Sequence, residues 1–186
     1  LIKDKAPGNA AHIESSAAFL VYCIDYSNIK LSFDIEGGEF DISNQYEPLL
    51  IGSMDVGIAM QNAALAAESL GYGIVYCGGV RGFAKGISEL LNIPENALFL
   101  CGLSIGVIDE EKSTEKVKPR LPHEANVGYN EFPKSNEEVL KQYRQTMIDF
   151  AEARETKTWT KKFADFYAQP SGIEAVTKEL LEKNGF

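Results

Sequence analysis

Apolar residues in this chain form two kinds of pattern, which alternate along its length. Three short apolar runs, rich in aromatic and β-branched residues and bounded by polar residues, predict buried strands at 17–25, 73–77 and 97–105. Apolar positions that recur at helical spacing predict the helices. We expect these helices at 48–70, 82–91, from 135 to about 153, 158–167 and 172–183.

The remaining segments have no clear period. Residues 27–47 include Gly37-Gly38 and are expected to be mostly loop, with a short element of undefined type. Residues 109–117 are charged, and residues 121–133 contain prolines and a glycine, so we expect irregular structure in both. Three strands interleaved with helices predict an α+β or α/β chain built in three layers.

The helix predicted at 48–70 is apolar on every face, and most of its apolar side chains are small. A helix of this kind is expected to be buried on all sides. It could be the central core helix of a monomer, or it could lie between two subunits of a dimer. We favour the intersubunit position, because full burial of so long a helix in a domain of this size often requires a second subunit.

The chain has 186 residues, of which 45% are hydrophobic and 24% charged, as expected for one soluble domain. Its net charge of −9 argues against a nucleic-acid backbone or an anionic membrane surface as a partner. The three cysteines lie inside apolar runs without metal-ligand spacing, so we expect buried reduced thiols, a cytoplasmic protein and no metal site. The first residues, L-I-K-D-K, read as the middle of a helix, and we expect an N-terminal part of the natural domain to precede them.

Two short motifs carry the candidate chemistry. The first is Y-C-G-G-V-R at 76–81, where paired glycines leave backbone N–H groups open to a flat polar ring. The second is K-P-R-L-P at 118–122, which holds Lys118 and Arg120 on a proline-stiffened segment suited to a phosphate. Together they predict a site for a large phosphorylated cofactor. Taken singly, the glycine pair could be a plain strand-to-helix turn, and the two cations could be a solvated surface pair.

The chain resembles the FMN-dependent nitroreductase family in three segments that follow the family's order: Q-N-A-A-L-A-A-E-S-L-G-Y-G-I-V-Y-C-G-G-V-R, F-L-C-G-L-S-I-G and K-P-R-L-P. The similarity is to its branch of oxygen-insensitive NADPH nitroreductases and flavin reductases, and it extends from about Gly8 to the helix near Trp159. It implies an α+β, nitroreductase-like three-layer fold, with a mostly antiparallel central sheet flanked by helices. It also implies a homodimer with FMN at the subunit interface. Residues 1–186 would form one FMN-binding domain, with 134–186 as a C-terminal helical extension.

The resemblance assigns the glycine motif to the flavin ring. Gly78 and Gly79 match the family's glycine pair, whose backbone N–H groups face the pyrimidine side of the isoalloxazine and its N5 atom. Tyr76 and Val80 flank this pair and are expected to line the same pocket. These four residues form the predicted ring-binding part of the site.

The basic motif is assigned to the phosphate. Lys118 and Arg120 match the family's K-x-R, which contacts the FMN phosphate, and Arg154 lies near an arginine that recognises NADPH in this branch. Ala10 stands where the family usually places a glutamine that contacts the flavin, so a side-chain hydrogen bond to the ring is absent. The family's basic N-terminal motif would precede Leu1.

The resemblance implies an FMN-dependent NAD(P)H oxidoreductase that reduces nitroaromatics, quinones or flavins. FMN carries the redox chemistry, so no catalytic residue is assigned to the protein itself. Because one pocket must serve the nicotinamide donor and the acceptor in turn, we expect ping-pong kinetics. The alternative is a non-catalytic dimeric protein that binds flavin or acts as a scaffold. A related flavin enzyme with another acceptor, such as a dehalogenase, usually needs an inserted lid, for which 79–97 leaves little room.

Overall fold

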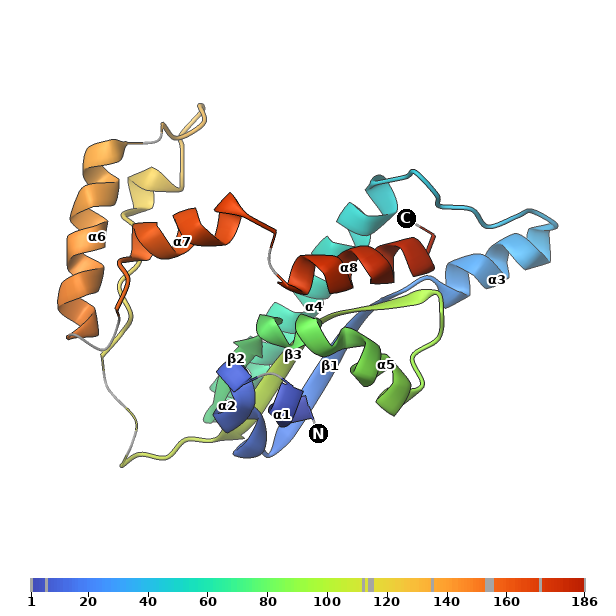
Figure 1. The fold of residues 1–186 in the computed structure, drawn as a ribbon, viewed down its shortest axis with the longest axis horizontal. Coiled ribbons are helices and arrows are strands. Elements are labelled where there is room, and N and C mark those ends of the chain that lie inside the picture. The colour runs from blue at the N-terminus through green and yellow to red at the C-terminus, as the bar shows by residue number, and fades with distance from the viewer. Residues whose placement is uncertain are drawn as a thin grey trace. The chain divides into compact units, whose positions relative to one another are not determined.

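The computed structural model describes residues 2–5, 7–111, 113, 116–134, 136–152, 156–170 and 172–185. The chain divides into two compact units (Figure 1). The first unit joins Leu1–Lys112 to Gly172–Phe186 and contains the sheet, and the second unit is Ser113–Ser171. The C-terminal helix therefore belongs to the unit of the sheet, although a separate helical unit precedes it in the sequence.

The first unit is built on a three-stranded sheet whose strands are β1 (Ala18–Asp25), β2 (Tyr72–Cys77) and β3 (Ala97–Val107). Their order is β1-β3-β2, and β3 pairs antiparallel with both neighbours. The three strands predicted from the sequence are confirmed, as is an antiparallel sheet. β3 is almost continuously apolar because it is the central strand and is covered on both faces.

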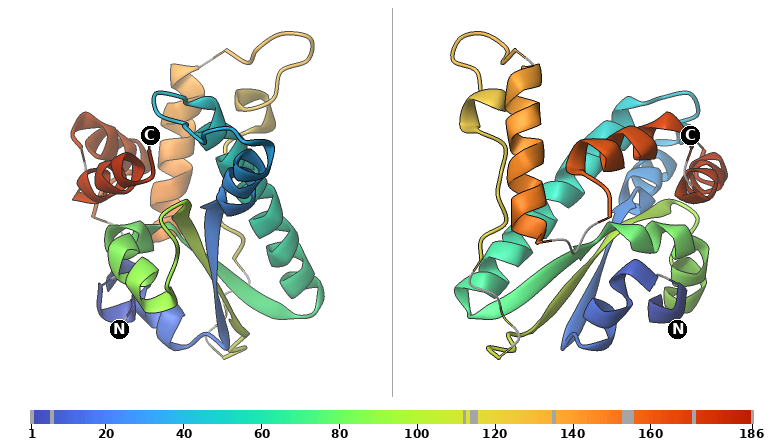
Figure 2. Two further views of the ribbon diagram at one scale, coloured as in Figure 1. Left: turned by 90° about the vertical axis from the view of Figure 1, so that its right-hand side faces the viewer. Right: turned by 60° about the vertical axis from the view of Figure 1, so that its left-hand side comes forward.

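Helices cover both faces of this sheet, which confirms the three-layer prediction for the first unit. Figure 2 shows the long helix α4 on one side of the sheet and α1, α2 and α5 on the other. The bounds are α1 Ile2–Lys5, η1 Pro7–Asn9, α2 Ala10–Glu14, α4 Glu47–Ser69, η2 Gly78–Phe83, α5 Ala84–Leu91 and α8 Gly172–Lys183.

The two faces of the sheet carry two hydrophobic cores, because side chains of a strand alternate between its faces. One core joins Phe99 of β3 to Val80 and Ile87 from the segment that follows β2, with partly buried side chains of α8 packed against it. The other joins Leu98 of β3 to Val56 of α4. Neighbouring residues of β3 thus pack into the cores on opposite faces of the sheet.

The structure differs from the sequence prediction at 27–47, where it contains a ten-residue helix, α3 (Ser27–Glu36). Gly37 ends this helix in the left-handed conformation, with φ at 71°. The amide of Gly38 donates to the carbonyl oxygen of Phe33 at 2.9 Å. The glycine pair that suggested a loop is therefore a helix C-cap. The apolar residues of α3 alternate along the chain (Ile29, Leu31, Phe33 and Ile35), so they form no stripe at helical spacing, and none of them is buried.

The predicted helix at 48–70 is confirmed as α4, but its burial on all sides is not found within this chain. Its buried residues are Gly52, Val56, Ala64 and Ala67. Large side chains on its other faces are exposed, among them Leu50, Ile51, Met54, Ile58 and Leu65. By length and composition alone α4 could also cross a membrane, which is a weak criterion that core helices of soluble proteins also meet. α4 is thus not the enclosed core helix of a monomer.

The second unit contains η3 (His123–Ala125), α6 (Glu137–Ala151) and α7 (Trp159–Ala168). α6 corresponds to the helix predicted from 135, and the side chain of Asn136 caps it by accepting from the amides of Glu138 and Val139. Thr158 caps α7 in the same way. Both predicted helices are confirmed, with their starts set by these caps.

The three cysteines are free thiols, as expected from the sequence. Cys77 and Cys101 are buried, and Cys23 is half-buried. Burial raises the pKa of the Cys23 and Cys101 thiols, because the charged thiolate is poorly solvated there. A raised pKa favours the neutral thiol of Cys23 and Cys101, which is a weaker nucleophile than the thiolate.

Candidate functional site

The glycine pair lies where β2 ends and the 3₁₀ helix η2 begins. Gly78 is half-buried and Gly79 is exposed, and both are in the first turn of η2. Amides in the first turn of a helix have no acceptor within the helix, so they can donate to a ligand. Val80, the next residue, is fully buried in the core and anchors this turn. Its exposed fraction is 0%, so in this chain Val80 supports the turn from within the core and presents no surface to a ligand.

Two residues that were not predicted as site residues lie against the glycine pair. A Cβ atom placed on Gly79 would lie 3.0 Å from Oδ1 of Asn9, which comes from the short η1 segment. A Cβ atom on Gly78 would lie 3.4 Å from Nη1 of Arg81. This guanidinium also donates to the carbonyl oxygen of Leu100 at 3.3 Å, which fastens η2 to β3. The proximity of Asn9 to Gly79 is a tertiary contact between residues 70 positions apart, which the spacing of motifs along the sequence does not reveal.

Tyr76 connects β2 to the long helix. Its hydroxyl lies 2.7 Å from Oε1 of Gln61 on α4 and donates to it. The neighbours of Tyr76, Val75 and Cys77, pack into the core on the opposite face of the sheet. Tyr76 therefore faces α4, while its ring stays partly exposed beside the glycine turn. The structure brings Tyr76, Gly78, Gly79 and Val80 together mainly because they are consecutive in the chain.

The predicted phosphate-binding cations belong to the second unit. Lys118 and Arg120 are exposed on both sides of the half-buried Pro119, in a segment without helical structure. Among the residues that the structure describes, neither cation forms an ion pair. Alternate residues of an extended segment point to the same side, so both cations can reach one anion. Arg154, predicted to contact NADPH, lies outside the described residues.

A cavity of about 590 Å³ that the sequence did not indicate lies between α3, α4 and the end of β1. Its wall includes Phe33, Phe40 and Ile51 together with the carboxylates of Asp25 and Asp41. These two carboxylates each accept from a backbone amide of a neighbouring turn, at 2.8 Å in both cases. These hydrogen bonds stabilise the adjacent turns. The rest of the cavity wall is mostly apolar.

Two family profiles match this sequence. The profile described as "Nitroreductase family" matches residues 40–107, which include α4, the glycine turn and β3. The profile described as "Nitroreductase family, C-terminal domain" matches residues 118–186, which begin at the basic motif. Relatives that are more than 30% identical match nearly the whole chain. The chain belongs to the nitroreductase family. The family that the sequence resemblance implied is thus confirmed.

The relatives of this chain include a metal-ion reductase and a flavin oxidoreductase, by their names. The Cr(VI) reductase of Pseudomonas sp. (strain G-1) is 38% identical over 184 residues, which cover 96% of this chain and 73% of the relative. The NADPH-flavin oxidoreductase of Vibrio harveyi is also 38% identical, over 83% of this chain and 63% of that protein. This chain therefore spans about two thirds to three quarters of the length of these relatives.

Solved structures share the fold of this nitroreductase. Nitroreductase A from Vibrio parahaemolyticus superposes with a TM-score of 0.82 at 36% identity, covering 98% of this chain and 73% of that one. The NADPH:FMN oxidoreductase from Vibrio harveyi, in complex with NAD⁺, gives 0.78 at 35% identity, covering 98% and 76%. A nitroreductase-like fold with helices around a small antiparallel sheet is thus established.

Proposed function

We propose that this nitroreductase is an FMN-dependent NAD(P)H oxidoreductase that reduces flat, electron-poor acceptors such as nitroaromatics, quinones or flavins. The family and the names of its relatives support a flavin-dependent reductase that uses NADPH. The observation that carries the proposal is the glycine pair at the start of η2. There, two backbone amides have no acceptor in the helix and neither residue has a side chain of its own, while Asn9 Oδ1 and the Arg81 guanidinium lie next to them.

Each unit carries residues whose chemistry suits one end of FMN. The Gly78 and Gly79 amides can donate to the ring, and the absence of side chains lets a planar group approach the backbone. Lys118 and Arg120 are exposed cations, and among the described residues neither has an acidic partner, so both are available to a phosphate dianion. We propose that the glycine pair binds the ring and that the two cations bind the phosphate.

When bound, FMN supplies the redox chemistry by accepting a hydride from a nicotinamide and passing electrons on to the acceptor. The protein binds and orients the ring through the Gly78 and Gly79 amides, whose dipoles favour the electron-rich reduced form. Tyr76, held by Gln61, limits the space beside this turn. We propose that Arg154 contacts NADPH. Because donor and acceptor use one pocket in turn, the kinetics are expected to be ping-pong.

This proposal is tested by adding FMN to the purified protein and recording visible absorption and flavin fluorescence. We expect stoichiometric uptake of FMN, and NADPH oxidation that depends on menadione or a nitrofuran and gives parallel lines in double-reciprocal plots. A protein that takes up no FMN would falsify the proposal. A protein that takes up FMN but oxidises no NADPH with any acceptor would instead be the non-catalytic flavin-binding protein considered from the sequence.

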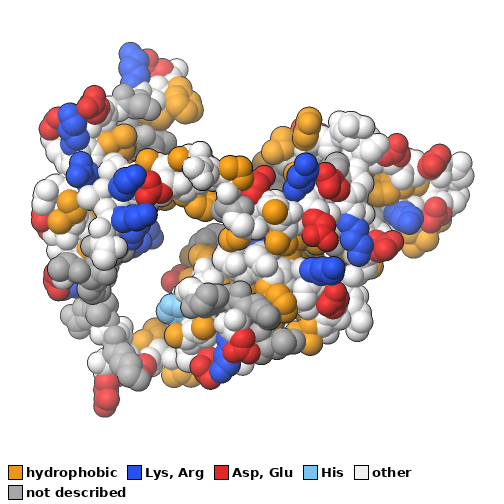
Figure 3. All heavy atoms as spheres, in the orientation of Figure 1, with side chains coloured by type: hydrophobic (Ala, Val, Ile, Leu, Met, Phe, Trp, Pro, Cys, Tyr) orange, Lys and Arg blue, Asp and Glu red, His pale blue; other side chains and the backbone are white. Residues whose placement is uncertain are grey.

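We further propose that the protein is a cytoplasmic homodimer with small aromatic acceptors and no nucleic acid or membrane as partners. The exposed apolar side chains of α4 form a surface whose contact with water is unfavourable. A second copy of the same helix can cover this surface. On the face drawn in Figure 3, basic and acidic side chains are interspersed over α5 and α8. This differs from the continuous basic surface typical of nucleic-acid-binding proteins.

Substituting Ile58 of α4 by glutamate is expected to convert the dimer to a monomer. The side chain of Ile58 is 64% exposed in the single chain, so the substitution costs the protomer little, whereas a charge buried between two copies is strongly unfavourable. Sedimentation velocity measures the change. The matched control is Leu90→Glu on α5, which is 48% exposed and should leave the dimer intact. An I58E protein that sediments like wild type would place the interface elsewhere.

A further inference from the structure

The segment that carries the two cations is attached to α6 at two points. The Lys116 ammonium forms an ion pair with the Glu152 carboxylate just beyond the C-terminal end of α6. Three residues later, the carbonyl oxygen of Pro119 accepts a hydrogen bond of 3.0 Å from the Tyr143 hydroxyl, in the middle of α6. The segment therefore runs alongside α6 in the opposite direction. The ion pair is exposed and therefore contributes little to stability. The hydrogen bond from Tyr143 is the more effective attachment of the segment to α6.

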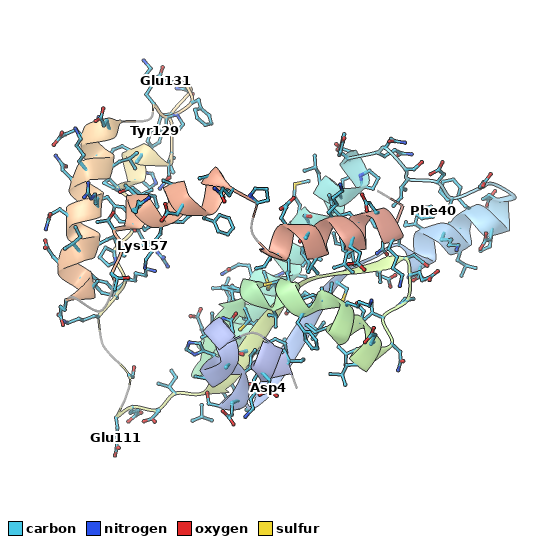
Figure 4. The ribbon with its side chains drawn as sticks, in the orientation of Figure 1. Asp4, Phe40, Glu111, Tyr129, Glu131 and Lys157 are labelled. Carbon is cyan, nitrogen blue, oxygen red and sulfur yellow. The ribbon has the colours of Figure 1, made fainter. Side chains whose placement is uncertain are left out.

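Tyr143 is held in place by aromatic packing. Its side chain is only 8% exposed, and its ring meets the Trp159 ring of α7 edge-to-face, at a centroid distance of 5.1 Å and an angle of 84°. Trp159 in turn packs on Phe163 at 4.7 Å. Lys157, labelled in Figure 4 just before α7, pairs with Asp165 and supports the same helix. The direction of the Tyr143 hydroxyl is thus fixed by two packed helices.

Pro119 is the residue through which this attachment can act on both cations. A proline has no backbone N–H, so its carbonyl oxygen is its one polar backbone group. The ring also fixes the φ angle of Pro119 and restricts Lys118 to extended conformations. A hydrogen bond at this carbonyl holds Pro119 toward α6 and leaves Lys118 and Arg120 on its two sides, both directed to solvent.

We propose that Tyr143 is a positioning residue for phosphate recognition, which holds Lys118 and Arg120 at the spacing and orientation that one phosphate dianion requires. The inference rests on the proposed function, since it assumes that these cations bind the FMN phosphate. The hydroxyl itself donates to the Pro119 carbonyl oxygen of the backbone. Its effect comes from ordering the segment before the phosphate arrives, which removes part of the entropic cost of binding.

The test is Tyr143→Phe, which keeps the ring and its packing on Trp159 and deletes only the hydroxyl. Dissociation constants for FMN and for riboflavin, which lacks the phosphate, are measured by quenching of flavin fluorescence. We expect FMN to bind up to about fivefold more weakly, because a hydrogen bond of about 1 kcal/mol can bias the segment toward its attached conformation by at most that factor, and riboflavin to bind as in wild type. Tyr129→Phe is the matched control, because Tyr129 is 80% exposed in the loop before α6 (Figure 4) and should change neither constant.

A second comparison separates positioning from general stabilisation. In a protein that already carries Lys118→Ala and Arg120→Ala, adding Y143F should not weaken FMN binding further, because the groups that it positions are gone. The melting temperature of the flavin-free protein shows whether Y143F is folded. If it is not, Pro119→Ala, which loosens the same segment, should give the same selective loss for FMN.

The possible failures are distinguishable. If wild type prefers FMN to riboflavin but Y143F binds both flavins as wild type does, the inference is wrong and the proposed function stands. Equal losses for FMN and riboflavin, or full additivity with the cation substitutions, also overturn the positioning role. A wild-type protein that binds neither flavin overturns the proposed function, and this inference with it.

Discussion

Replacing Lys118 and Arg120 together by alanine is expected to weaken FMN binding by about a hundredfold or more while leaving riboflavin binding unchanged. Each cation is expected to form a charge-assisted hydrogen bond with the phosphate, and such bonds contribute about 1.5–3 kcal/mol each. Losing two of them corresponds to at least two powers of ten in the dissociation constant. Both side chains are exposed, so their removal should not disturb the core.

The measurement is the ratio of the FMN and riboflavin dissociation constants, taken at two salt concentrations. In wild type the dissociation constant for FMN should be far below that for riboflavin, and this ratio should rise toward one as salt rises, because ionic strength screens exposed charges. In K118A/R120A it should be close to one and insensitive to salt. Lys141→Ala with Arg144→Ala removes the same charge from exposed positions on α6 and serves as the control. An equal loss in this control would mean that net charge, rather than a phosphate site, sets the affinity.

Replacing Phe99 by alanine is expected to lower the free energy of unfolding by about 3–5 kcal/mol, the usual cost of deleting a buried aromatic ring. Phe99 is 2% exposed, lies on the central strand β3, and belongs to the core that also holds Val80 of the glycine turn. The cavity left behind cannot close easily, because β3 is paired on both sides. The turn that positions the two amides should therefore loosen as the core is lost.

Chemical denaturation at a fixed protein concentration measures this effect, since the stability of a dimer depends on concentration. The control is the same substitution at Phe132, which is 90% exposed and should change the free energy by less than about 0.5 kcal/mol. A difference between F99A and F132A below about 1 kcal/mol would contradict the central position of Phe99 in the core.

The sequence predicted the parts of this fold that bury a periodic apolar stripe. The helices α6 and α8 were found in this way, and the strands were found as short apolar runs. α3 was missed because its apolar residues alternate at every second position and form no stripe at helical spacing, and because Gly37-Gly38 suggested a loop. For α4, the sequence predicted more burial than the single chain provides. Its composition indicated burial on every face, but composition cannot tell which faces the chain itself covers.

For the candidate site, residues close in sequence were predictable and contacts between distant residues were not. Gly78, Gly79, Lys118 and Arg120 stand in short motifs that need particular residue types at fixed spacing. Asn9 lies beside Gly79 although 70 positions separate them, and Tyr143 reads as an ordinary core residue of a helix. Only the folded structure shows that the Tyr143 hydroxyl donates to the carbonyl oxygen of Pro119 in the basic motif.

The helix α8 completes the first unit but is synthesised after the second unit. Val176 and Leu180 of α8 pack against the core built from the glycine turn and β3, yet they are made after the whole of 113–171. A ribosome-bound chain in which β1, β2 and β3 are complete still exposes the part of this core that Val176 and Leu180 will cover. Shielding by chaperones during this interval would matter more for this protein than for one whose last helix is an independent appendage.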